Sequence, residues 1–374
     1  MTLRSGVVGI WIIATGVMIA ILYFGRSILA PFALAVFLFL IMEGFARVID
    51  EQVHFLGRRI SRAIAILLVL LGFGLFFALF AQGIAQFGEQ ASDYEQKINV
   101  LIADVYGVLR LDSAPTLTEI IFNETGQRFF ATIANATGDL SGDLVVILIY
   151  VAFLFVAQSA WGQKLDRLFP ITEQREQVRE VGAAARRGIE TYLWTQTVIS
   201  ALITVLTYFT LIVLGADNVL FLAALIFVLN YIPTIGSIVA AFVPTLFALV
   251  QPDLPAWLPA TGENASYVFA LFVFLGVSFW QFAIGNFVQP RIMGETLNLS
   301  ALIVLLSLAI WGAIWGIPGM FLSAPLTVLM MILFAQSAST RWIAVLLSAD
   351  GNPGGVVAKP ANDDLVITAE TSED

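Results

Sequence analysis

The chain has 374 residues and a formal net charge of −9; 59% of its residues are hydrophobic and 12% are charged. Because soluble globular proteins carry about 25% charged residues, this composition excludes an ordinary soluble enzyme, a disordered chain and a coiled coil. The acidic balance, without a basic stripe, excludes nucleic acid as a partner. The absence of cysteine excludes disulfides and thiolate metal sites. The composition predicts an all-α fold, that of a polytopic helical membrane protein.

Charged residues are segregated along the chain. Eight windows contain no Asp, Glu, Lys or Arg, and they cover residues 5–25, 27–42, 63–88, 144–163, 191–216, 218–252, 264–290 and 296–340. A helix needs about 20 apolar residues to cross the hydrocarbon core of a bilayer, so six windows suit one crossing each. The short second window extends through Glu43 and Arg47, which we expect to pair at i, i+4 spacing. The pattern predicts about eight transmembrane elements.

Two of the windows, 218–252 and 296–340, are too long for one straight crossing and contain helix breakers in their middles. Proline removes a backbone donor and clashes with the preceding turn. A broken backbone at membrane depth must be buried in protein or line a water-filled cavity. We therefore predict broken or re-entrant hairpins over 219–250 and 300–335, with a kinked single helix as the alternative. The residues at the breaks are Asn230, Tyr231, Pro233, Gly236 and Ser237 in the first window, and Gly316, Pro318, Gly319 and Pro325 in the second.

The distribution of basic residues indicates the orientation in the membrane. The connectors 47–62 and 161–190 are rich in arginine and lysine, whereas segment 89–143 carries a net charge of −6. We predict that the two connectors and both termini are cytoplasmic and that 89–143 is external. The stretches 191–250 and 266–335 then have opposite orientations, which is the inverted-repeat pattern of secondary transporters.

The same patterns divide the chain into five segments. We expect a three-helix membrane part over 1–88, an extracytoplasmic amphipathic helical segment over 89–143, and a fourth span with cytoplasmic linker helices over 144–190. A transport core with an inverted repeat follows over 191–345, and a disordered acidic tail over 346–374.

Residues for catalysis are missing from the charge-free windows. The chain has no Walker A sequence, its one histidine is His54, and no pair of carboxylates lies within a window. Acid–base, metal and ATP chemistry therefore have no candidate residues. We expect no enzymatic activity, no cofactor and no metal site.

Uncharged polar residues remain at membrane depth, where such groups usually face a bundle interior or a water path. Besides the residues at the breaks, the candidate substrate path contains Gln281, Asn286, Gln289, Pro290, Arg291 and Gly294. Three carboxylates at window edges are candidates for coupling to an ion, namely Glu43, Asp217 and Glu295. The alternative role for each polar residue is interhelical hydrogen bonding alone.

Three stretches of sequence carry a family resemblance. They are Asn230-Tyr231-Ile232-Pro233-Thr234-Ile235-Gly236-Ser237 with Pro244, then Gly285-Asn286-x3-Pro290-Arg291-Ile292-Met293-Gly294, and the run from Leu299-Ser300 through Trp311-Gly312 and Gly316-Ile317-Pro318-Gly319 to Ala324-Pro325-Leu326. Together they resemble the autoinducer-2 exporter-like transporters over residues 7–340. One departure is Ala301, where that family usually has proline.

The resemblance implies a permease of the bacterial inner membrane that has cytoplasmic termini and assembles as a homo-oligomer. Members of the family are associated with export of a furanone-type quorum-sensing signal, and others with sodium–proton antiport.

We predict a transporter that exports, or facilitates the passage of, a small polar solute across the inner membrane. Its site would lie between the breaks at 230–237 and 316–319, and 286–295 would form the cytoplasmic gate. The alternatives are a monovalent cation–proton antiporter of the same fold and a non-transporting membrane scaffold. The expected partners are the lipid bilayer, the solute and further copies of the chain.

Overall fold

The computed structural model describes residues 2–52, 58–89, 91–110, 113–123, 127, 144–258, 264–293 and 298–353. The regular structure in these residues is helical, and an isolated bridge between Leu299 and Ser348 is the β feature found in them. The prediction of an all-α fold is confirmed.

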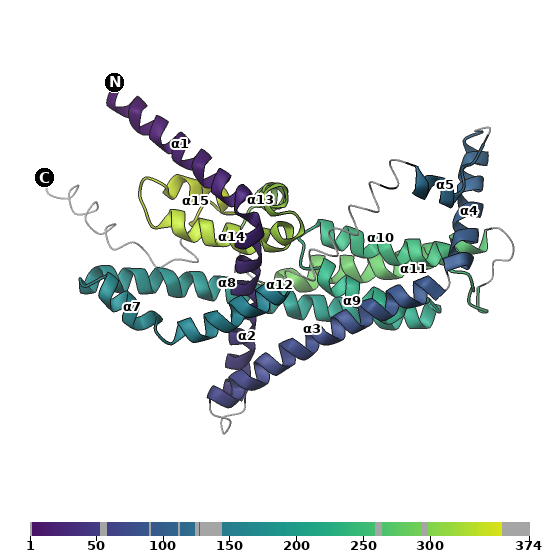
Figure 1. The fold of residues 1–374 in the computed structure, drawn as a ribbon, viewed down its shortest axis with the longest axis horizontal. Coiled ribbons are helices and arrows are strands. Elements are labelled where there is room, and N and C mark those ends of the chain that lie inside the picture. The colour runs from purple at the N-terminus through teal and green to yellow at the C-terminus, as the bar shows by residue number, and fades with distance from the viewer. Residues whose placement is uncertain are drawn as a thin grey trace, which may run out of the picture. The chain divides into compact units, whose positions relative to one another are not determined.

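Each charge-free window contains helix, and further helices lie in the charged segments between and after the windows (Figure 1). Their bounds are α1 Thr2–Phe24, α2 Arg26–Gln52, α3 Arg58–Glu89, α4 Ala91–Val108, α5 Leu117–Phe122, α7 Trp161–Leu168, α8 Thr172–Leu214, α9 Val219–Leu229, α10 Ile235–Val250, α11 Ala265–Ala283, the π-helix η1 Ile284–Val288, α12 Gln289–Met293, α13 Ala301–Trp315, α14 Ile317–Ala335 and α15 Arg341–Leu347. A further helix, Leu144–Gln158, precedes α7.

Five of the described helices are long and apolar enough to cross a membrane. They include Arg26–Arg47, Ile66–Gly83, Thr172–Leu214, Ala265–Ile292 and Ile317–Ala335. The helix Leu144–Gln158 and α7 are bent by 63° at their junction, and they make a sixth span if the pair is counted as one. Three shorter apolar helices, α9, α10 and α13, lie in the two long windows. The protein is therefore a multi-pass helical membrane protein, and both long windows are broken into two helices.

Contacts between helices divide the chain into two compact units, each assembled from separate stretches of sequence. Unit 1 comprises Met1–Glu51, Val146–Thr195 and Met293–Asp374, and unit 2 comprises Gln52–Val145 and Gln196–Ile292. Helix α8 contributes residues to both units. Each unit is described by itself below.

In unit 1, α13 and α14 form a tight helical hairpin around Gly316. This residue has φ +66° and ψ −139°, which only glycine adopts without strain. Pro318 lies in the first turn of α14, where its missing N–H costs nothing. A Cβ atom on Gly319 would lie 1.9 Å from the carbonyl oxygen of Trp311. The two helices approach this closely because Gly316 and Gly319 have no side chains. Small residues permit the same close packing between helices in lipid.

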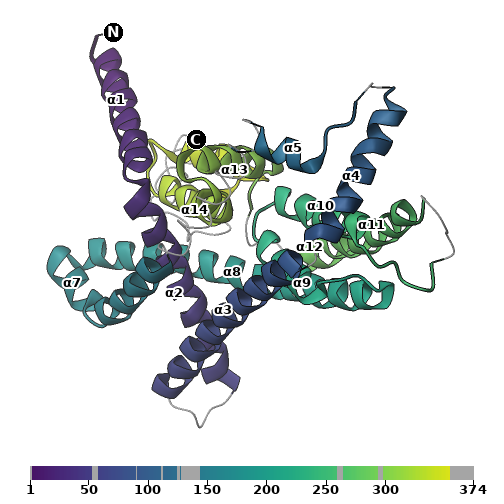
Figure 2. The same cartoon turned by 45° about the vertical axis from the view of Figure 1, so that its right-hand side comes forward.

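In unit 2, α9 and α10 are separated by a break at residues 230–234. Helix α10 packs along α11, and the two lie side by side in Figures 1 and 2. The core between these helices and α8 contains fully buried side chains, such as Leu211, Phe269 and Val273. Because lipid is as apolar as leucine, this core is stabilised by van der Waals fit and interhelical hydrogen bonds.

The predicted external segment 89–143 contributes α4 and α5 to unit 2. Helix α5 begins with a capping box, in which Thr116 Oγ1 accepts from the Glu119 N–H and the Glu119 carboxylate accepts from the Thr116 N–H. Residues 128–143 of this segment lie outside the described residues.

The predicted tail starts at 346, within α15, and hydrogen bonds connect the residues after this helix to Asn298. Asn298 Nδ2 donates to Asp350 Oδ1 at 2.8 Å and to the Asn352 carbonyl at 2.9 Å. The Ala349 N–H donates to the Asn298 carbonyl at 2.9 Å. Residues 354–374, the remainder of the predicted tail, lie outside the described residues.

Candidate functional site

The break between α9 and α10 is dictated locally by Pro233. Proline disfavours the helical conformation of the residue before it and cannot donate to the preceding turn. The chain then passes through Thr234, which has φ +61°, an unusual value for a β-branched residue. A Cβ atom on Gly236 would lie 1.8 Å from the Leu229 carbonyl oxygen, so glycine is required where α10 starts against the end of α9. Strained backbone of this kind clusters at ligand sites and switch regions.

A group of buried and half-buried polar side chains contacts this break, and we call it the amide cluster. It consists of Gln196 and Thr197 on α8, Asn230 and Tyr231 at the end of α9, and Gln281 on α11. Gln196 Nε2 donates to the Asn230 carbonyl at 2.6 Å, and Gln281 Nε2 donates to Asn230 Oδ1 at 3.1 Å. The hydroxyls of Thr197 and Tyr231 are hydrogen-bonded at 2.7 Å. Side chains from two neighbouring helices thus bind groups at the end of α9, as a break at membrane depth requires.

The amide cluster retains an open hydrogen-bond donor. Asn230 is 7% exposed, and its Nδ2 has no hydrogen-bond partner among the described residues. A buried polar group without a partner costs about 1–3 kcal/mol. The cluster therefore contains a binding group whose partner is not supplied by the described part of the chain.

Three hydroxyl groups continue from the amide cluster along α8. Ser200, Thr204 and Thr207 follow Gln196 at i+4, i+8 and i+11, so the four side chains share one helix face. Each of the three hydroxyl oxygens is buried, and none has a hydrogen-bond partner within the described residues. We call these three residues the hydroxyl row. By contrast, Thr210 Oγ1 donates to the Leu206 carbonyl and accepts from Trp280 Nε1, both at 2.9 Å.

The structure places the predicted coupling residue Glu43 in an ion-pair network of unit 1 whose carboxylates are buried and whose arginines are partly exposed. Arg186 donates to Glu43 at 3.3 Å and to Glu190 at 2.6 Å, and Arg47 contacts Glu190 at 2.9 Å. Glu43 and Arg47 both lie on α2 at i, i+4 spacing, and each binds a partner on α8. Among the described residues, these contacts involve two arginines and two carboxylates, and they join α2 to α8.

Sequence reasoning missed Glu190 and Arg186. The available signal was their i, i+4 spacing immediately before the charge-free window 191–216, which places an ion pair on one helix face. Their burial depends on α2, which is distant in sequence.

The other predicted coupling residues lie elsewhere. Asp217 lies between α8 and α9, where burial and, secondarily, the charge of Asp253 raise the pKa of its carboxyl. Its backbone N–H donates to Gln251 Oε1 at 2.9 Å. Glu295 and the path residue Gly294 lie outside the described residues.

The predicted gate begins in a π-helical turn. Pro290 cannot donate to the carbonyl of residue 286, and the chain widens so that the Gln289 N–H donates to the Ile284 carbonyl. Asn286 is exposed and its Nδ2 donates to the Phe282 carbonyl at 2.9 Å. Pro290 and Arg291 are exposed, and Gln289 is half-buried. Gating by this segment stays a prediction.

The remaining predicted path residues divide between the units. Ser237, whose hydroxyl donates to the Thr234 carbonyl at 2.8 Å, belongs to unit 2 with Pro233 and Gly236. Gly316, Pro318, Gly319 and the buried Pro325 belong to the α13–α14 hairpin of unit 1. A site between the two breaks therefore stays a prediction. No group of residues able to hold a metal ion occurs within the described ranges.

Long apolar helices, a broken helix and an uncharged polar cluster at the break are features of membrane transporters. Residues 12–339 match the family described as "AI-2E family transporter". The chain belongs to this AI-2E transporter family, as the resemblance in its sequence implied.

Relatives agree with this assignment. The AI-2 transport protein TqsA of Escherichia coli K12 is 28% identical over 353 residues, which cover 90% of this chain and 95% of TqsA. A putative transport protein of Haemophilus influenzae is 27% identical over 91% of this chain and 94% of its own length. A putative transport protein of Borreliella burgdorferi is 29% identical over 69% of this chain and 68% of its own length.

Proposed function

We propose that the protein exports a small, uncharged polar solute across the bacterial inner membrane. The observation that carries the proposal is the amide cluster together with the hydroxyl row, which shares a face of α8 with Gln196; none of these polar side chains is charged. The open groups include the Asn230 Nδ2 donor and the three hydroxyls of α8.

The amide and hydroxyl groups favour an uncharged polar solute. Amides and hydroxyls exchange hydrogen bonds with hydroxyl and carbonyl groups at little net cost, because each bond to water is replaced by an equivalent bond. An ion at the same place would lose its hydration without gaining an opposite charge. The name of the relative TqsA suggests AI-2, the furanone-type signal, as a member of the solute class.

The orientation follows from the basic connectors. Arginine and lysine are concentrated in 47–62 and 161–190, so the positive-inside rule supports cytoplasmic termini. Export is then movement toward the side of α4 and α5. A homo-oligomer in the membrane is part of the same proposal and stands on the family resemblance.

Uptake into everted membrane vesicles tests the proposed direction and solute class. Everted vesicles that contain the protein should accumulate AI-2 faster than vesicles without it. Asn230→Leu and Gln281→Met remove polar groups of the amide cluster and should each slow uptake about tenfold. The matched control is Gln174→Met, at an exposed glutamine on the first turns of α8, and its uptake should equal that of the unaltered chain.

Two results would overturn the proposal. Uptake no faster than in empty vesicles would favour a membrane scaffold. Uptake of sodium or potassium driven by a pH gradient, with no uptake of AI-2, would favour the antiporter.

A further inference from the structure

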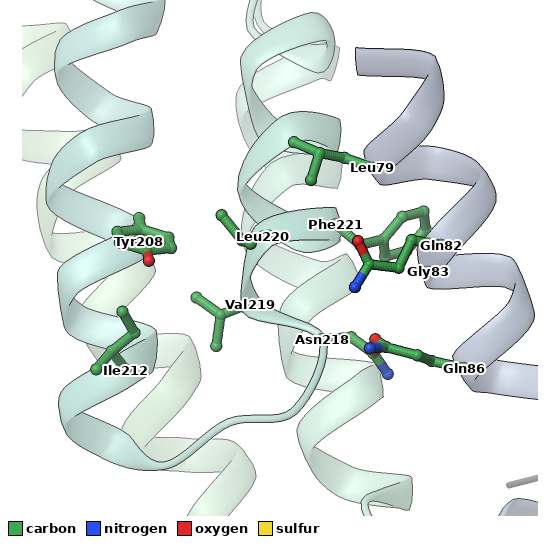
Figure 3. A pocket seen from close by; sticks show the side chains of 10 residues that line it. All are labelled: Leu79, Gln82, Gly83, Gln86, Tyr208, Ile212, Asn218, Val219, Leu220 and Phe221. Atoms are coloured by element: carbon green, nitrogen blue, oxygen red, sulfur yellow. The ribbon is translucent and has the colours of Figure 1, made fainter. Parts of the chain in front are cut away.

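Unit 2 contains a pocket of about 240 Å³ bounded by α3, α8 and the start of α9 (Figure 3). Its polar side chains include Gln82 and Gln86 on α3, Tyr208 on α8 and Asn218 before α9. Gln82 and Gln86 point from α3 toward the loop that carries Asn218, and Tyr208 lies on the opposite wall (Figure 3). The residues that line the pocket in the described part of the chain carry no charge.

One wall of the pocket is built by close packing of Phe221 against Gly83. A Cβ atom on Gly83 would lie 2.4 Å from the Phe221 ring, so only glycine lets the ring lie this close to α3. The rings of Phe80 and Phe221 are also in contact, with centroids 5.3 Å apart. The wall is thus set by specific aromatic packing.

The pocket and the amide cluster lie at opposite ends of α9. Asn218 precedes this helix and Asn230 ends it, and its 11 residues extend about 16 Å. On α8, Gln196 binds the Asn230 carbonyl, whereas Tyr208, twelve residues later, lines the pocket. The hydroxyl row lies between those two positions on α8. The pocket and the amide cluster thus both contact α8 and α9, at different positions along each helix.

We propose that this pocket is a binding site for a neutral, polyhydroxylated molecule. The inference rests on the proposed function, because it assigns that function a second solute site. A cavity of about 150 Å³ holds benzene, which has six non-hydrogen atoms, so the pocket suits a solute of about ten. Two glutamine amides, one asparagine amide and one phenol supply both donors and acceptors for hydroxyl groups.

Protection from thiol labelling tests the site with D-ribose as the probe, because ribose is neutral and polyhydroxylated and has the required size. The chain has no cysteine, so Gln86→Cys creates a single reactive thiol at the pocket. D-ribose at about ten times its Kd should slow modification of this thiol by N-ethylmaleimide about tenfold. Gln96→Cys, at an exposed position on α4 outside the pocket lining, should react at the same rate with and without ribose.

A second variant separates blocked binding from a damaged fold. Val219→Trp, combined with Gln86→Cys, fills the pocket and should abolish protection by ribose while the thiol still reacts. Equal protection by choline chloride would overturn the assignment of a neutral ligand. Protection by phosphatidylglycerol without protection by ribose would overturn it in favour of a lipid site.

The two experiments distinguish a failure of the pocket as a binding site from a failure of the proposed export. If AI-2 uptake depends on Asn230 but ribose does not protect Gln86→Cys, the pocket is not a solute site and the proposed export stands. If ribose protects the thiol but vesicles accumulate no solute, the pocket binds its ligand and export is refuted.

Discussion

Gln281 Nε2, on α11, donates a hydrogen bond to Asn230 Oδ1, at the end of α9, over 3.1 Å. This bond occupies the acceptor side of the Asn230 amide, while the Asn230 backbone carbonyl accepts from Gln196. The donor side, Nδ2, is left without a partner among the described residues. The arrangement holds a broken helix together and presents one polar group for binding, and it motivates the predictions that follow.

Thr207→Val should raise thermal stability and lower solute uptake. The Thr207 hydroxyl is buried without a partner among the described residues, so an isosteric apolar group removes a cost of about 1–3 kcal/mol. Thr210→Val is the matched control on the same helix. It breaks bonds with Trp280 and Leu206 and should lower stability. Thermal unfolding in detergent measures both, and equal destabilisation by the two changes would contradict a hydroxyl row.

Glu43→Gln should lower the free energy of unfolding by about 1–3 kcal/mol, because Arg186 loses its charged partner at the buried side chain of Glu43. Asp166→Asn is the control, since Asp166 binds Arg175 and Arg179 at an exposed position and its loss should cost less than about 1 kcal/mol. Denaturation monitored by circular dichroism compares the two. Loss of uptake without loss of stability in Glu43→Gln would instead make this carboxylate a coupling residue.

Gly319→Ala and Gly236→Ala should each prevent folding of a monodisperse protein. The added methyl would lie 1.9 Å and 1.8 Å from backbone carbonyl oxygens, which cannot move without opening the turn between two helices. Gly74→Ala has open space around the new methyl and should be neutral or stabilising by up to about 1 kcal/mol. Size-exclusion profiles of the purified variants distinguish these outcomes. Normal profiles for Gly319→Ala and Gly236→Ala would refute the close approach of these glycines to the carbonyl oxygens.

Asp217 should make stability fall as pH rises. Burial, and then the charge of Asp253, raise the pKa of the Asp217 carboxyl above its ordinary value of 3.8. The folded protein therefore holds this proton more tightly than the unfolded chain does. The stabilisation is complete below pH 3.8 and is lost as pH rises through the folded pKa. Asp217→Asn should unfold at a higher temperature than the unaltered chain at pH 7 and at the same temperature at pH 3.5.

The pKa of Asp350 is shifted in the opposite direction to that of Asp217. Hydrogen bonds from the Asn352 N–H and the Asn298 side chain lower the pKa of its carboxyl. The contribution of Asp350 to folding stability is present above the pKa of this carboxyl in the unfolded chain, and it is lost as pH falls through its pKa in the folded protein. Asp350→Asn should therefore lower the unfolding temperature at pH 7. Melting curves at pH 7 in which Asp217→Asn and Asp350→Asn change the unfolding temperature in the same direction would contradict the two pKa shifts.

Much of the helical order was predictable from charge and proline alone. Charged residues cannot lie against lipid without cost, so the charge-free windows mark the apolar helices. Pro233 and Pro318 cannot continue the helix before them, so both long windows break where the sequence predicts. The extent of α8 was not predictable in this way, because it continues from a charged connector into an apolar window without a breaker.

The sequence by itself determined the class of fold, the position of both breaks and the family. The fold class and the breaks depend on local properties, namely the hydropathy of each window and the effect of proline on the helix that contains it. Only the tertiary structure decided that Gln196 binds the Asn230 carbonyl, 34 residues away, and that Arg186 binds Glu43, 143 residues away. Such pairs depend on which helix faces meet, and many arrangements of the same apolar helices bury equal surface in lipid. The partners of polar groups, and the hydroxyls left without one among the described residues, therefore became visible only in the packed molecule.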